Sequence, residues 1–168
     1  KRLTSAGLMV DNNPLRLVEI AHFRPEMEAL RQGGQGPLST VGPEFDYTLR
    51  AFPNHHRALD AILRLSARDR TDQPKGMRYT ISCWFERAVR FVPDDPIVRM
   101  LFATYLGKTN RVEEALQHLA FAAKSNADNA FTQYNVGLAY FDMKQFDLAL
   151  KQAHISYGMG MQRLELKE

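Results

Sequence analysis

A repeat with a step of 34 residues constrains the fold of this chain more than any other feature of its sequence. Residues that lie 34 positions apart are of similar kind: small residues correspond to small residues, and large apolar residues correspond to large apolar residues. The related pairs are Phe102 and Val136, Ala103 and Gly137, Leu106 and Tyr140, Val112 and Phe146, Ala115 and Ala149, and Leu116 and Leu150. A period of this size is typical of stacked antiparallel helix pairs, in which no pair buries its apolar face alone. We therefore expect an all-α stack with a surface for another protein, and no catalytic pocket.

Composition narrows the classes of partner. The net charge of +3 is small, and lysine and arginine form no block, so we expect no nucleic-acid partner. No apolar run approaches the roughly 18 residues that a membrane-spanning helix needs. Cys83 is the only cysteine, which excludes a disulfide within the chain. The sequence pattern divides the chain into an N-terminal extension, residues 1–42, and a repeat domain, residues 43–168.

The extension is predicted to hold two short helices and a glycine-rich loop. Residues 1–13 show no sustained period. Prolines suit the first turn of a helix, so the pattern predicts helices over Pro14–Ala21 and Pro25–Arg31, the first with Asn13 as its N-cap. The loop follows at Gly33–Pro37. Glutamates and arginines alternate in these helices, which predicts local ion pairs on an exposed face.

The repeat domain is predicted to contain about three helical hairpins. The expected helices are Phe45–Pro53, Asn54–Ser66, Tyr79–Val92, Pro96–Leu106, Val112–Ala123, Ala130–Phe141 and Phe146–Tyr157. We expect Ala67–Met77 to be an exposed basic loop, because Pro74 and Gly76 interrupt the helical stripe. Asp94 and Asp128 stand where helix N-caps are needed. Met161–Glu168 is expected to begin a terminal capping helix.

These features resemble the tetratricopeptide repeat family. Its first-helix pattern fits Tyr134, Val136, Gly137 and Tyr140, and its second-helix pattern fits Ala149, Ala153 and Ser156. Arg99 and Gln133 depart from it, because the family often has tryptophan there. The resemblance covers roughly residues 43–160. It implies an α-α superhelix, a tetratricopeptide-like solenoid with about three hairpins behind the N-terminal helical extension.

A narrower resemblance concerns the compartment. The segments LRLVEIAHF (Leu15–Phe23) and DYTLRAFPNHHRAL (Asp46–Leu59) are similar to a group of exported bacterial tetratricopeptide proteins of unassigned function. This implies a periplasmic or otherwise exported protein, with the cytoplasm as the alternative.

In the family this chain resembles, the first helices of successive pairs line a concave groove. The groove positions are Arg57, Asp60, Arg64, Ile97, Met100, Thr104, Lys108, Phe131, Tyr134, Leu138 and Phe141. The groove would be charged at one end and apolar at the other, and so large an apolar stripe needs a cover. Two covers are open: an apolar face of a partner protein, or the chain's own N-terminal helices and residues 161–168. For Tyr134 and Phe141 we expect internal cover.

Candidates for chemistry are few. His22, His55 and His56 could approach a metal or haem, although adjacent histidines on a helix diverge by about 100° and rarely share one ion. His55 is expected to cap its helix instead. Cys83 is expected to pack as a small apolar residue, since nothing nearby would activate it. We therefore predict no cofactor and no metal.

The sequence thus predicts a non-catalytic scaffold or adaptor that binds another protein or a larger assembly. Because three hairpins are near the minimum for a stack that stands alone, a homo-oligomer is also open. Two rival interpretations stay open. One is an accessory subunit of a redox or cell-envelope complex, with the histidines near a metal or haem. The other is a ligand-binding or enzyme-like domain that uses Cys83 or the histidines.

Overall fold

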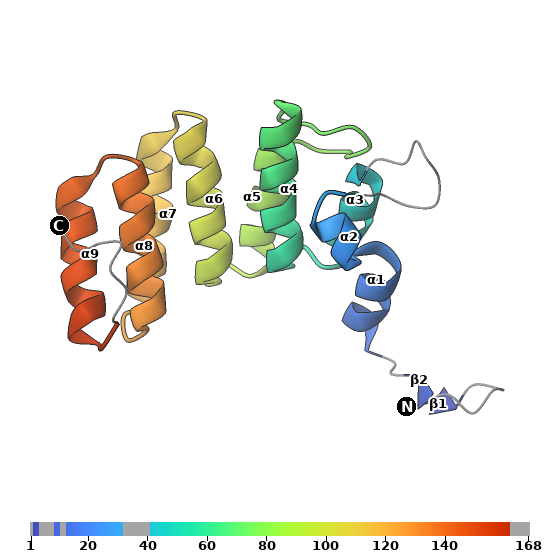
Figure 1. Ribbon diagram of the computed structural model, residues 1–168, viewed down its shortest axis with the longest axis horizontal. Coiled ribbons are helices and arrows are strands. Elements are labelled where there is room, and N and C mark those ends of the chain that lie inside the picture. The colour runs from blue at the N-terminus through green and yellow to red at the C-terminus, as the bar shows by residue number, and fades with distance from the viewer. Residues whose placement is uncertain (1, 4–8, 11–12, 32–40, 162–168) are drawn as a thin grey trace. The chain divides into compact units, whose positions relative to one another are not determined.

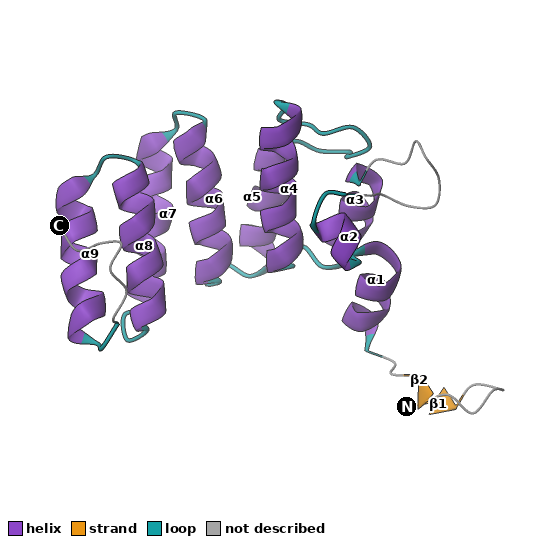
Figure 2. Cartoon of the chain, viewed as in Figure 1, coloured by secondary structure: helices purple, strands orange, loops and turns teal. Residues whose placement is uncertain are grey.

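The computed structural model describes residues 2–3, 9–10, 13–31 and 41–161, and almost all of its regular structure is helical (Figure 1). The protein is all-α in class. Its one exception within the described residues is a pair of two-residue antiparallel strands, β1 (Arg2–Leu3) and β2 (Met9–Val10), in a segment where the sequence predicted no regular element (Figure 2). The expected glycine-rich loop and most of the expected terminal capping helix lie outside the described residues.

Packing divides the chain into two compact units, Lys1–Arg87 and Ala88–Glu168. The boundary falls inside α5, whereas the sequence pattern placed a boundary after residue 42. The helices that begin in the first unit are α1 (Pro14–His22), α2 (Pro25–Glu28), α3 (Gly42–Ala51), α4 (His56–Asp69) and α5 (Ile81–Phe91). The N-terminal helices α1 and α2 therefore belong with α3 and α4.

Two predicted caps begin helices of the first unit. Asn13 Oδ1 accepts a hydrogen bond of 3.0 Å from the Leu15 amide at the start of α1. At the start of α4, His55 Nδ1 accepts one of 3.1 Å from the Ala58 amide. Each bond satisfies an amide that the first helical turn leaves without a partner. Both caps were predicted, whereas α2 ends three residues earlier than expected.

The segment between α4 and α5 is largely exposed, as the sequence predicted, but it begins later than expected and is anchored to α3. Helix α4 continues to Asp69, and the segment then folds back against α3. The Arg78 amide donates a hydrogen bond of 2.9 Å to Oδ1 of Asp46, a buried residue of α3. Met77 is buried as well. A buried carboxylate needs donors, and this loop supplies one, so the segment packs as part of the first unit.

The core of the first unit includes Trp84, the only tryptophan of the chain. Phe45, Leu49 and Ile62 are fully buried beside other apolar residues of α3 to α5, and only 1% of Trp84 is exposed. The ring of Tyr79 meets the Trp84 indole edge to face, with 5.2 Å between centroids. Among the described residues, the buried indole Nε1 finds no hydrogen-bond acceptor.

The second unit contains two hairpins in the predicted register. They are α6 (Pro96–Lys108) with α7 (Val112–Ser125), and α8 (Ala130–Asp142) with α9 (Phe146–Gly158). The helices α6 and α8 begin 34 positions apart, and so do α7 and α9. Throughout the described range 41–161 there is no strand, so the predicted helical character of this region is confirmed.

Small residues are buried where the helices of a hairpin cross. Ala103 of α6, Ala115 of α7 and Ala149 of α9 are buried, as is Gly137 of α8. The larger residues at the related positions Leu106 and Tyr140 are buried as well. Such close-packed positions tolerate little added volume. The burial predicted from the repeat for Ala115 and Gly137 is therefore confirmed.

The N-caps of α6 and α8 lie one residue later than predicted. Asp95, not Asp94, accepts from the amides of Ile97 and Val98 at 3.0 and 3.2 Å. Asn129, not Asp128, accepts from the Thr132 amide at 2.9 Å. In both places two polar residues follow one another, and only the second reaches the first helical turn.

Candidate functional site

The predicted groove positions lie on the three helices α4, α6 and α8. Arg57, Asp60 and Arg64 lie on α4, in the first unit, and the other eight lie on α6 and α8, in the second. The two sets are therefore described separately.

On α4, the N-terminal helices contact Arg57 at the predicted charged end. The Arg57 guanidinium pairs with both carboxylate oxygens of Glu28 and lies 3.8 Å from Glu19. It also lies over the ring of Phe23, 5.3 Å from its centroid. The hydrogen bonds from Arg57 lower the pKa of Glu28, and Glu28 in turn raises the pKa of Arg57. Arg57 is therefore tied to the N-terminal helices, although its side chain stays 55% exposed.

The acidic residues of α1 and α2 make contacts that the sequence did not predict. Glu19 and Glu28 bind side chains of α4 and its N-cap. The ion pairs thus fasten the extension to α4. The pair Arg64–Asp60 is local to α4, at 2.9 Å and i,i+4 spacing.

In the second unit, α6 and α8 form the two walls of a trough. One depression, of about 340 Å³, is lined by Ile97, Met100, Phe131 and Leu138 among others. A second, of about 450 Å³, is lined by the residues around Lys108. Thr104, Ala139 and Asp142 line both. The two depressions are therefore one continuous trough along the helices, and it contains the predicted groove residues Ile97, Met100, Thr104, Lys108, Phe131 and Leu138.

The apolar part of the trough is open. Phe131 is 56% exposed and Ile97 is 42% exposed, although both are large apolar side chains. Two of the three polar side chains that line it bond to their own helix: Thr104 Oγ1 donates to the Met100 carbonyl at 3.1 Å, and Asn135 Nδ2 donates to the Phe131 carbonyl at 2.7 Å. The third is Asp142, at the end near the lysines. The apolar wall surface therefore has few groups left for hydrogen bonding with an occupant.

Two predicted groove residues do not line this trough. Tyr134 is buried, with 1% exposed, and packs with Ala153, Leu138, Tyr157 and Met161, so it is unavailable to a partner. The small side chain of Ala153 leaves room for its ring. Internal cover was expected for Phe141 as well, but Phe141 is 52% exposed. It contacts Phe146 edge to face, with 5.6 Å between ring centroids.

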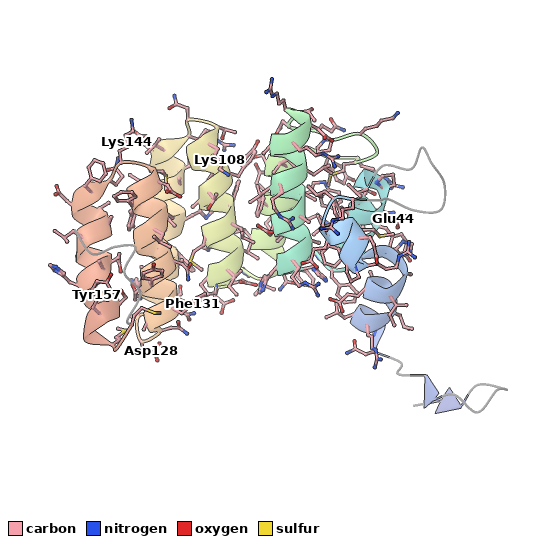
Figure 3. The ribbon with its side chains drawn as sticks, in the orientation of Figure 1. Glu44, Lys108, Asp128, Phe131, Lys144 and Tyr157 are labelled. Atoms are coloured by element: carbon pink, nitrogen blue, oxygen red, sulfur yellow. The ribbon has the colours of Figure 1, made fainter. Side chains whose placement is uncertain are left out.

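Two lysines mark one end of the trough. Lys108 ends α6 and Lys144 follows the end of α8, and both line the larger depression with Asp142 (Figure 3). Neither lysine makes an ion pair with any residue in the described part of the chain. Lys144 was not among the predicted groove residues, because it lies outside the helical stripe, in a left-handed turn with φ of 60°. The opposite end of the trough lies near Phe131 and Asp128 (Figure 3).

The histidines contact carboxylates and aromatic rings. His55 Nε2 lies 3.0 Å from Glu19 Oε1, and its Nδ1 caps α4. His22 Nδ1 lies 2.7 Å from Glu44 Oε2, and its ring stacks on Tyr47. Within the described residues, no group of three His, Cys, Asp or Glu side chains is placed to hold a metal ion.

Cys83 is half-buried on α5 with its thiol free, so it is more accessible than the prediction of a packed apolar residue implied. The described helices include none with the length and apolar character of a membrane span. The sequence matches no protein-family model, and no curated protein matches it either.

Proposed function

We propose that this protein is a non-catalytic interaction module that binds a segment of another protein in the trough between α6 and α8. One observation carries the proposal: a continuous trough whose walls expose large apolar side chains, among them Phe131 and Ile97. Exposed apolar surface of this kind marks sites of interaction with other proteins. Helical scaffolds commonly use such surfaces to hold a partner.

The finer assignment to the tetratricopeptide type belongs to the same proposal. The 34-residue step between the hairpins and the small residues at their crossings support it. The departures at Arg99 and Gln133 are compatible with it, because both side chains bond to the segment that precedes their hairpin. A location outside the cytoplasm rests on the narrower sequence resemblance alone.

The proposal is tested by selecting partners and then mapping where they bind. A displayed library of peptides is selected on the whole protein, and the enriched peptides are titrated against three proteins: wild type, Phe131→Asp and Leu150→Asp. Phe131 lines the trough, whereas Leu150 is a similarly exposed apolar residue of α9 that does not. Both substitutions leave the buried core alone, and circular dichroism checks helicity.

We expect enriched peptides to lose at least about tenfold in affinity for Phe131→Asp, a loss of about 1.4 kcal/mol, and to keep their affinity for Leu150→Asp. Peptides that bind Phe131→Asp as tightly as wild type would place the binding surface elsewhere. A selection that enriches no specific peptide would contradict the proposed function.

A further inference from the structure

We propose that the occupant of the trough is an amphipathic α-helix of a partner protein, lying antiparallel to α6 and α8 with acidic side chains in its first turn. This inference rests on the proposed function and specifies the chemistry of the partner. It is drawn from the walls of the trough, its length and the charges at its end.

The walls favour a helix over an extended peptide. An extended segment on these walls would bring its backbone amides and carbonyls against Ile97, Met100 and Phe131, which offer no hydrogen bonds. Thr104 and Asn135 donate to carbonyls of their own helices. Backbone groups that lose water without gaining a partner cost free energy, whereas a helix satisfies its own backbone. The apolar trough therefore suits a helix that places an apolar stripe on it.

The length of the trough suits between about three and four helical turns. It runs from Ile97 and Phe131, in the first turns of α6 and α8, to Lys108 and Lys144 at their ends. Each of these helices has 13 residues, which corresponds to about 20 Å at 1.5 Å per residue. A partner helix of similar length would contact both walls along the whole trough. Its apolar residues would recur at i, i+3, i+4 and i+7.

The charges set the direction of the partner helix. Lys108 and Lys144 carry positive charge that no described carboxylate pairs with, while Asp142 is the one acidic side chain lining the same depression. The net charge at this end of the trough is therefore positive, and it favours an occupant that carries carboxylates there. Acidic residues are most favourable in the first turn of a helix, where they meet the positive end of its dipole. With that turn beside the lysines, the partner runs antiparallel to α6 and α8, and the helix dipoles are also opposed.

Two capped peptides of about 14 residues, labelled for fluorescence anisotropy, test this assignment. They have the same composition and the same apolar stripe, but one has two glutamates in its first turn and the other has them in its last. A third peptide carries a central proline in the first sequence, so that it cannot form the helix. Each is titrated against wild type, Phe131→Asp, the double variant Lys108→Gln and Lys144→Gln, and the control Lys151→Gln, a lysine of α9 outside the trough.

The peptide with acids first should bind wild type about tenfold more tightly than the peptide with acids last. The preference should disappear in the double lysine variant, persist in Lys151→Gln, and shrink in about 0.5 M salt, where charges are screened. Phe131→Asp should weaken both helical peptides.

Equal affinity for the two helical peptides, with loss in Phe131→Asp, would overturn the assigned direction while the proposed function stands. Equal affinity for the proline peptide would overturn the helical occupant in the same way. If neither helical peptide binds, the assignment fails, and the library selection then decides separately on the trough as a binding site. Analytical ultracentrifugation tests for a dimer of the protein. If wild type forms a dimer and Phe131→Asp dissociates it, the occupant of the trough is a second copy of this chain, and the proposed partner helix is overturned.

Discussion

Arg99 and Gln133 occupy related positions in the two hairpins, 34 residues apart, and perform related tasks with different chemistry. The Arg99 guanidinium donates to the Pro93 carbonyl and lies over the Phe121 ring, 3.8 Å from its centroid. Gln133 donates its amide to the carbonyls of Ala123 and Asn126 at 2.8 and 2.9 Å. Each side chain thus donates to carbonyls at the end of the preceding segment, where helix termini leave carbonyls without intrahelical partners. Both residues differ from the tetratricopeptide pattern that the sequence resembles. At each position the side chain still links its helix to the segment that precedes it.

A neighbour of Arg99 gives a pH-dependent prediction. Burial lowers the pKa of His118, and the positive charge of Arg99 lowers it further. The Arg99 Nη1 lies 3.2 Å from His118 Nδ1, which fits a neutral ring that accepts a hydrogen bond. The folded state therefore disfavours the protonated histidine. The stability that this preference provides is present above the unfolded pKa of about 6.5 and is lost as the pH falls toward the lowered folded value.

We expect His118→Gln to lose less stability than wild type when the pH falls from about 7.5 to about 5, because one group that resists protonation has been removed. Urea unfolding at the two pH values measures the difference. His154→Gln, on an exposed position of α9, serves as the control and should retain the wild-type pH dependence. If His118→Gln and wild type lose equal stability, His118 does not contribute to this pH dependence.

At the scale of elements, the position of the connection between α4 and α5 could not be predicted from the sequence pattern. Pro74 and Gly76 correctly mark a break in helix, but they do not indicate that the segment returns to α3. That return depends on Asp46, which accepts from the Arg78 amide 32 residues later and from Arg50 at 2.9 Å. Such a long-range contact leaves no periodic signal. The sequence also did not predict that α4 continues to Asp69.

Gly42, in the first turn of α3, gives a prediction for this connection. A Cβ atom at Gly42 would overlap the Lys75 carbonyl oxygen, and backbone on both sides leaves little room to relax. We expect Gly42→Ala to destabilise the protein by about 1–3 kcal/mol. Denaturant unfolding measures the change.

Gly158→Ala is the matched control for that substitution. Gly158 lies at the end of α9, and nothing stands within 4 Å of an added Cβ atom. Because alanine favours a helix over glycine, this variant should gain up to about 1 kcal/mol. If Gly42→Ala is as stable as wild type, the α4–α5 connection can shift away from the added Cβ atom without a loss of stability.

At the scale of the whole molecule, the hairpins of the second unit were the easiest part to predict. Their 34-residue step can be recognised from buried small residues such as Ala103 and Gly137, because close helix crossings require small side chains. The trough was predicted less completely. Helical spacing places Tyr134 on the same stripe as Phe131, and spacing alone cannot show that Ala153 of α9 leaves space for the Tyr134 ring. Lys144 was missed because it lies in a turn, where periodicity gives no position.

The division into two units predicts that a destabilising substitution in one unit lowers the stability of that unit alone. Ala103 is fully buried at the α6–α7 crossing, so Ala103→Leu should destabilise the second unit by about 1–3 kcal/mol through overpacking. Hydrogen exchange followed by mass spectrometry should show reduced protection in α6 to α9, with α3 and α4 close to wild type. Ala120→Leu, on the exposed side of α7, should change neither. Equal loss of protection in α3 and α4 would mean that the chain unfolds as one cooperative body.

The enclosed indole of Trp84 makes the chain its own spectroscopic probe. Because this is the single tryptophan and it lies in the core of Lys1–Arg87, its emission follows the unfolding of that unit, while the far-ultraviolet signal averages over all helices. Fluorescence and circular dichroism recorded on one sample therefore distinguish, without any label, which half of the polypeptide melts first.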